Sequence, residues 1–156
     1  MMKKKRGTVF LFLFLIASAL SLSGCASVST APLPPTLNIV SPSPDLPPEI
    51  AAFSGVWEGQ WVNMLDTILV VEKINTETAE IIYSTGEREM CCQAIYVYIT
   101  ARVIPGPAIE WTNKKGYRFV FKMNKDLNSI DAFIEDRSTG SKWWRAHLTR
   151  MKSKQQ

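Results

Sequence analysis

Hydrophobic and polar side chains alternate at a period of two through most of the chain after residue 50. A β-strand has this repeat because successive side chains point to opposite faces of a sheet, whereas a helix repeats every 3.6 residues. The pattern, or a run of β-branched residues, covers eight short segments: 56–62, 67–74, 79–84, 94–104, 109–112, 117–123, 129–136 and 142–150. No segment has the spacing of a long amphipathic helix. The sequence therefore predicts an all-β domain.

Turn-forming residues separate the eight segments. They lie near Asn63, Asn75, Gly86, Gly106, Gly116, Asp126 and Gly140. Gly, Asn and Asp tolerate the backbone angles of tight turns, so we expect consecutive strands to pair as hairpins. Eight such strands in about 100 residues favour an antiparallel, up-and-down eight-stranded barrel, because closure leaves no exposed edge. A β-sandwich is the alternative architecture.

The first predicted strand carries a recognisable motif. Residues 55–61, Gly-Val-Trp-Glu-Gly-Gln-Trp, and residues 69–74, Leu-Val-Val-Glu-Lys-Ile, resemble small bacterial lipocalin-like domains within the calycin-like barrels. Those barrels begin with Gly-x-Trp, and an Arg near the last strand often covers the Trp ring. The resemblance implies a structural plug made by Trp57 and Arg150, with Arg145 as the second candidate for the arginine. Arg150 is favoured because it shares the more apolar face of the last segment.

Large apolar residues occupy the faces that should turn into the barrel. The resemblance to lipocalins implies a small hydrophobic ligand or lipid inside. The candidate ligand-binding residues are Trp61, Ile95, Val97, Ile99, Phe119, Phe121 and Trp144. An eight-stranded barrel can also be just wide enough for its own side chains. A filled interior would argue against a carrier and favour a module for protein–protein interaction or inhibition in the cell envelope. Outward-facing Tyr96, Tyr98 and Trp143 would then offer an aromatic patch.

The first 25 residues have the pattern of an export signal. Lys3 to Arg6 are all basic, an apolar run of about 12 residues follows, and Leu-Ser-Gly-Cys ends at Cys25. The run fits the ~7–15 residues of a secretory signal and is shorter than the ~20 of a membrane-spanning helix. This order resembles bacterial lipoproteins, which implies removal of residues 1–24 and lipidation of Cys25, a stable membrane anchor. In some lipoprotein families, Asp directly after the lipidated Cys retains the protein in the inner membrane. This chain has Ala26 there, which favours a location on the outer membrane, facing the periplasm. An ordinary secretory signal and an uncleaved anchor are the alternatives.

Residues 25–49 differ in composition from the rest. They hold seven of the nine prolines, with many Ser and Thr and no periodic apolar pattern. Proline lacks an amide hydrogen and fixes φ, so we expect a disordered, extended and unpaired linker. At about 3.1 Å per residue, it would reach at most ~75 Å from the membrane. The barrel domain should then occupy residues 50–152, followed by a tail over 153–156.

Residue types suited to catalysis are sparse. His147 is the single histidine, so no His-rich metal site can form, and no Ser or Cys motif supplies a nucleophile beside it. Glu58, Glu72 and Glu110 are isolated strand carboxylates, which normally face solvent. There is no Gly-rich phosphate loop. We therefore expect a non-enzymatic protein with no cofactor and no metal.

Cys91 and Cys92 are adjacent. If Cys25 is lipidated, they are the two thiols left in an oxidising compartment, where a disulfide between them is one outcome. Free thiols and an intermolecular bridge are the others.

The formal charge of +4 has a local origin. Residues 1–24 hold four basic and no acidic residues, and the rest of the chain holds 14 of each. A mature chain without net charge lacks the clustered cationic face that nucleic-acid binding needs. The predicted partners are thus a membrane, a small hydrophobic ligand or an envelope protein, and not nucleic acid.

Overall fold

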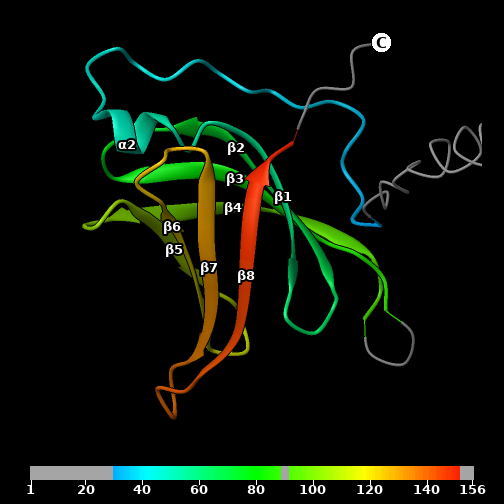
Figure 1. The fold of residues 1–156 in the computed structure, drawn as a ribbon. Coiled ribbons are helices and arrows are strands. Elements are labelled where there is room, and N and C mark those ends of the chain that lie inside the picture. Colours follow the sequence, from blue (N-terminus) through cyan, green and yellow to red (C-terminus); the bar gives the residue numbers. More distant parts are fainter. Residues whose placement is uncertain (1–29, 89–91, 152–156) are drawn as a thin grey trace, which may run out of the picture.

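The computed structural model of the protein describes residues 30–88 and 92–151 and has an all-β fold (Figure 1). Each strand pairs antiparallel with the next along the chain, and the last pairs with the first, which closes a barrel. The strands are β1 (Gly55–Trp61), β2 (Asp66–Ile74), β3 (Thr78–Thr85), β4 (Ile95–Ile104), β5 (Ala108–Thr112), β6 (Tyr117–Met123), β7 (Ser129–Asp136) and β8 (Lys142–Arg150). The predicted up-and-down eight-stranded barrel is confirmed, and the β-sandwich alternative is wrong.

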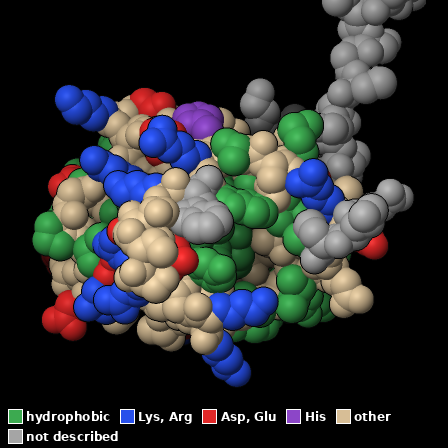
Figure 2. All heavy atoms as spheres, turned by 90° about the horizontal axis from the view of Figure 1, so that it is seen from below, with side chains coloured by type: hydrophobic (Ala, Val, Ile, Leu, Met, Phe, Trp, Pro, Cys, Tyr) green, Lys and Arg blue, Asp and Glu red, His purple; other side chains and the backbone are tan. Residues whose placement is uncertain are grey.

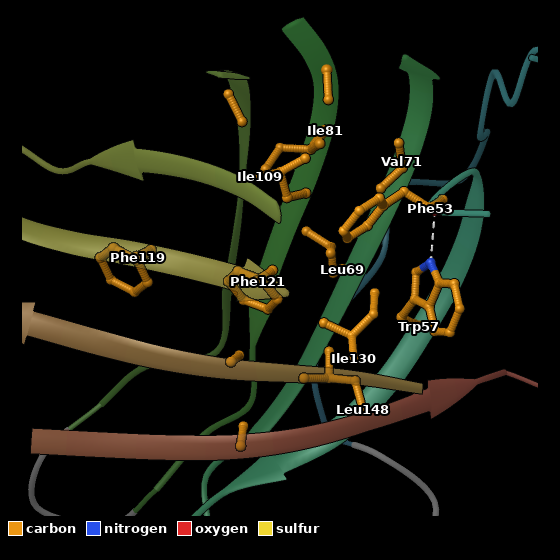
Figure 3. Packing of buried hydrophobic residues seen from close by; sticks show 14 of the residues in the cluster. Phe53, Trp57, Leu69, Val71, Ile81, Ile109, Phe119, Phe121, Ile130 and Leu148 are labelled. Atoms are coloured by element: carbon orange, nitrogen blue, oxygen red, sulfur yellow. Dashed lines mark hydrogen bonds between the residues drawn. The ribbon is translucent and has the colours of Figure 1, made fainter. Parts of the chain in front are cut away.

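Strand alternation places one set of side chains inside the barrel. The register sets Trp57 of β1 opposite Leu69 of β2, and Trp61 opposite Ala146 of β8. Figure 3 shows the inner-face residues packing together in one buried cluster, which includes Leu69, Val71, Ile81, Ile109, Phe119, Phe121, Ile130 and Leu148. Side chains thus fill the interior at this level, as the width of an eight-stranded barrel allows.

One end of the barrel, where β2, β4 and β6 finish, is plugged. The short helix α2 (Pro48–Ala51) and Phe53 lie there, and the Trp57 indole Nε1 donates a hydrogen bond to the Phe53 carbonyl at 2.7 Å. The Arg150 guanidinium lies 4.3 Å from the centre of the Trp57 ring. It also donates to two carbonyl oxygens of the turn after α2, at 3.0 and 2.6 Å. Arg145, by contrast, is exposed on the opposite face of β8.

The Pro-rich segment is folded against the barrel. Residues 30–47, here named the N-terminal strap, run along the outside of β2 towards α2 (Figure 1). The Thr30 amide and hydroxyl donate to the Asp66 carboxylate at the start of β2, at 2.8 and 3.1 Å. Near the other end of β2, the Val40 amide donates to the Glu72 carbonyl at 2.8 Å.

Apolar residues on the outside of the sheet explain why the strap docks. Ile68, Val70 and Ile82 point outward, and they are buried because apolar side chains of the strap pack on them. Covering them removes apolar surface from water, which contributes about 25 cal/mol per Å². The expectation of an unpaired, disordered linker is therefore wrong for residues 30–49, and the folded unit begins before residue 50. Residues 1–29 and 152–156 lie outside the described residues.

The other end, where β1, β3, β5 and β7 finish, is named the mouth end. β4 has ten residues and β5 has five, and only Arg102 to Ile104 of β4 pair with β5. Residues 95–101 of β4 pair with β3 alone, and the mouth-end halves of β3 and β4 diverge from the other strands (Figure 1). The barrel wall is therefore split between β4 and β5 towards the mouth end.

Candidate binding site at the mouth of the barrel

A stack of aromatic rings forms the floor of the mouth. Trp111 stacks on Phe119 and Phe121, with ring centres 5.0 and 5.2 Å apart. Tyr83 packs against the same three rings at centre distances of 5.3 to 6.1 Å. Such contacts add about 0.5–1.5 kcal/mol per pair beyond the area that they bury. The floor is therefore the mouth-end part of the buried core.

The hydroxyl of Tyr83 in this floor is hydrogen-bonded inside the barrel. The Trp61 indole Nε1 donates to the Tyr83 hydroxyl at 3.1 Å. Burial raises the pKa of Tyr83 to about 12, although hydrogen bonds to this hydroxyl oppose the shift. The Tyr83 hydroxyl therefore stays protonated at physiological pH and serves as a structural group.

Below the floor lies an apolar pocket of about 320 Å³, here named the mouth pocket. Tyr117 and Phe119 of β6, Ile134 of β7 and Trp144 of β8 line it. These residues share the inner face, because the register sets Phe119 opposite Ile134 and Ile134 opposite Trp144. Ligand pockets have volumes of about 300–1,000 Å³. The mouth pocket is thus large enough for a small apolar group.

All seven predicted ligand-binding residues lie on the inner face, but they do not line one cavity. Trp61, Phe119 and Phe121 belong to the buried core, and Ile99 and Trp144 are half-buried at its edge. Ile95 and Val97 are 55% and 39% exposed. Their exposure follows from the split wall, since β5 does not extend beside them.

Sequence reasoning missed several residues of the mouth. These are Tyr83 and Trp111 in the floor and Tyr117 and Ile134 in the pocket wall. Strand parity alone could have identified both residues of the pocket wall, since Tyr117 shares a face with Phe119 and Phe121, and Ile134 shares a face with Ile130 and Ala132. Trp111 carried a weaker signal because its strand is only five residues long.

Charged side chains cluster outside the split wall. The buried carboxylate of Glu110 on β5 binds Arg102 of β4, and it accepts from Arg118 Nε of β6 at 2.6 Å. Arg118 also donates to Glu135 of β7 at 2.9 Å. This network joins β4, β5, β6 and β7. Its Arg102 and Glu110 are also the β4–β5 backbone pair that lies nearest the mouth end.

The network fixes the charge of its central carboxylate. Burial alone raises the pKa of Glu110, but hydrogen bonds and positive charge from Arg102 and Arg118 outweigh it, so the pKa lies below its ordinary value. A carboxylate that stays ionised at neutral pH cannot serve as a general acid there. Glu58 and Glu72 are not part of the network. The arrangement therefore matches a structural clamp.

The single histidine lies on the outer face. His147 Nδ1 is 2.7 Å from the Asp131 carboxylate, and both side chains are exposed. They border a groove of about 510 Å³ over β7 and β8, which Lys142 and Arg145 also line. Within residues 30–88 and 92–151, no three His, Cys, Asp or Glu side chains gather as a metal site.

The cysteines fall largely outside the described part of the chain. Cys92 is disulfide-bonded. Cys25, predicted to be lipidated, lies outside the described residues. So do Cys91, one possible disulfide partner of Cys92, and the side chain of Trp143.

No known family model matches the chain, and no curated protein matches it in sequence. Within the described residues, no helix combines the length and apolar character needed to cross a membrane. The likeness to lipocalins and to bacterial lipoproteins therefore stays a sequence-based prediction.

Proposed function

We propose that the chain is a lipid-anchored, non-enzymatic protein of the bacterial cell envelope that binds a small hydrophobic ligand or lipid at the mouth of its barrel. The order of basic, apolar and Leu-Ser-Gly-Cys residues before position 26 supports lipidation of Cys25. The absence of Asp at position 26 supports the outer membrane, facing the periplasm, as its location.

The observation that carries the binding proposal is the mouth pocket. Its four lining residues are all apolar or aromatic, and they lie beside a floor of stacked rings. Because the core above the floor is filled, the pocket would take one apolar end of a molecule rather than enclose a whole ligand. Covering pocket walls with an apolar ligand gains the same hydrophobic free energy as burial in folding.

The proposed anchor has a consequence for the disulfide. The chain has three cysteines, and lipidation uses the sulfur of Cys25. The disulfide of Cys92 must then include Cys91 if it is intramolecular. Intact-mass and non-reducing peptide measurements on the mature protein therefore test lipidation and disulfide pairing together.

Displacement of a fluorescent fatty acid from the purified protein tests the pocket. Replacing Trp144 by Ala removes one wall, and about 1.5 kcal/mol of lost burial weakens binding roughly tenfold. His147→Ala is the matched control, since it changes the outer face of the same strand. Equal affinity in the wild type and in Trp144→Ala would show that the pocket is not the binding site.

A second candidate function rests on the outer face of β4. Tyr96 and Tyr98 are exposed there, with their rings edge to face at 6.0 Å. Tyrosine pairs of this kind are frequent in protein interfaces. If Tyr98→Ala abolishes co-purification of an envelope protein and leaves fatty-acid binding intact, protein interaction is the better description.

A further inference from the structure

We infer that the mouth end rests on the membrane surface, so that the mouth pocket takes a membrane lipid directly from the bilayer. This inference deepens the proposed function and uses the proposed lipid at Cys25 to orient the barrel. Three features of the mouth end carry it: the position of the strap, the exposed apolar side chains and the distribution of charge.

The strap brings the anchor to the mouth end. Thr30 is held by Asp66, the first residue of β2, beside Gly86, which follows β3. Only five residue steps separate Thr30 from Cys25. A chain spans at most about 3.6 Å per residue, so Cys25 lies within roughly 20 Å of Thr30. The strap occupies the rest of the Pro-rich segment on the barrel wall, so it cannot serve as a spacer.

Exposed apolar side chains concentrate at the same end. Among the described residues, seven of the nine exposed large hydrophobic side chains belong to the mouth-end halves of the strands or to the β1–β2 turn. Val62 and Met64 at the tip of that turn are 68% and 71% exposed. Single exposed apolar residues are normal on a protein surface, but a group at one end marks an interaction site.

The charge of the mouth end complements an anionic membrane. The mouth end holds seven basic and four acidic residues in its described part, which comprises residues 61–66, 85–88, 92–96, 112–118 and 135–145. The basic residues are Arg88, Lys114, Lys115, Arg118, Arg137, Lys142 and Arg145. Figure 2 looks onto this end and shows Lys and Arg side chains around hydrophobic ones.

Most acidic residues of the mouth end have a hydrogen-bond or salt-bridge partner among the described residues. Asp66 binds the strap, Glu135 binds Arg118, and Asp136 accepts from Ser138. Lys114 and Lys115, in the β5–β6 turn, make no salt bridge with any described residue. Each Lys near an anionic bilayer strengthens partitioning by roughly fivefold. The mouth end therefore combines the side chains of Lys114 and Lys115 with exposed apolar side chains on other turns and strands, the combination that binds a lipid surface.

Lysine labelling of the lipidated protein in vesicles of phosphatidylethanolamine and phosphatidylglycerol tests the inference. Peptide mass spectrometry reads the labelling rates of Lys114 and Lys115, with Lys122 and Lys125 near the plugged end as the internal reference. We expect Lys114 and Lys115 to be labelled about fivefold more slowly in the vesicles than in the unlipidated chain free in solution. The labelling rates of Lys122 and Lys125 should not change. Equal labelling of both pairs, or protection of the reference pair, would overturn the inference.

Two matched variants sharpen the result. Val62→Ser with Met64→Asn removes the apolar tips, and Asn suits position 64 because φ there is 67°. We expect this variant to lose the protection of Lys114 and Lys115. Ile39→Ser with Val40→Ser makes the same kind of change in the strap, away from the mouth, and should keep the protection. The inference fails if both variants behave alike.

Two further outcomes separate the alternatives. Protection that disappears when the protein-to-lipid ratio is lowered indicates contact between copies of the chain, and the inference is then wrong. A mature protein without lipid on Cys25 refutes the proposed anchor by mass alone. Flotation of the chain with the same vesicles then decides the inference: flotation lost in Lys114→Gln with Lys115→Gln supports it, and absence of flotation overturns it.

Discussion

Replacing Phe121 by Ala tests whether the barrel is solid. Phe121 of β6 is fully buried, and its ring contacts Trp61, Tyr83 and Trp111 at centre distances of 5.2 to 6.1 Å. In a filled core this substitution leaves a cavity that rigid neighbouring rings cannot close. Phe→Ala changes in well-packed cores destabilise by about 3–5 kcal/mol. In a domain of this size, the loss lowers the melting temperature by roughly 10–20 °C.

Urea unfolding followed by tryptophan fluorescence gives the free energy of unfolding directly. Phe133→Ala is the control, because it removes the same atoms from the outer face of β7, where Phe133 is only half-buried beneath Lys142. We expect the control to lose about 1 kcal/mol or less.

A ligand-binding readout completes this test. An apolar cavity left by Phe121→Ala should bind benzene, so benzene should raise the melting temperature of this variant and not that of the wild type. A loss below about 1.5 kcal/mol, or equal stabilisation of the wild type by benzene, would refute the reasoning and indicate a hollow barrel.

Three further predictions concern the plug, the barrel wall and pH. Arg150→Lys keeps the charge but loses the forked hydrogen bonds and the planar stacking, so we expect thermal unfolding to show a loss of about 1–3 kcal/mol. A Cβ at Gly59 would overlap the His147 carbonyl on β8, so Gly59→Ala should destabilise by about 1–3 kcal/mol, whereas His147→Ala should be near neutral by the same measurement. Burial raises the pKa of Asp66, but hydrogen bonds from Thr30 and from the Gln60 amide outweigh it and lower the net pKa. Because the folded pKa lies below the unfolded value, this stabilisation is complete at neutral pH and is lost as pH falls below about 4. Urea unfolding at neutral and acidic pH should therefore show a smaller difference in Asp66→Asn than in the wild type, and an unchanged difference would contradict the contact.

The eight strands were predictable because the period of a strand and the turn residues are both local properties of sequence. Parity also assigned the inner face correctly, as Trp61, Phe121 and Trp144 show. The contact of Arg150 with Trp57 was predicted from the resemblance to calycin-like barrels, and strand parity favoured Arg150 over Arg145. Closure of the barrel sets the two residues opposite each other.

The strap and the split wall were harder to predict, for different physical reasons. The proline-rich composition of the strap is typical of a solvated chain. Its few apolar residues, which cover Ile68 and Val70, show no periodic pattern that would predict their packing. A signal was present, since residues 67–71 are apolar or β-branched at consecutive positions and so need cover on both faces. The exposure of Ile95 and Val97 depends on the unequal lengths of β4 and β5, which no local pattern encodes.

Closure of the barrel through β1 and β8 has a consequence for the order of folding. The hydrogen bond from Arg150 to Ser54 joins residues 96 positions apart. The ring of strands therefore cannot form until nearly the whole chain is available. Contacts of such long range make folding slow relative to helical domains of similar size. While β8 is not yet available, β1 can pair with β2 alone, so the barrel stays open on that side.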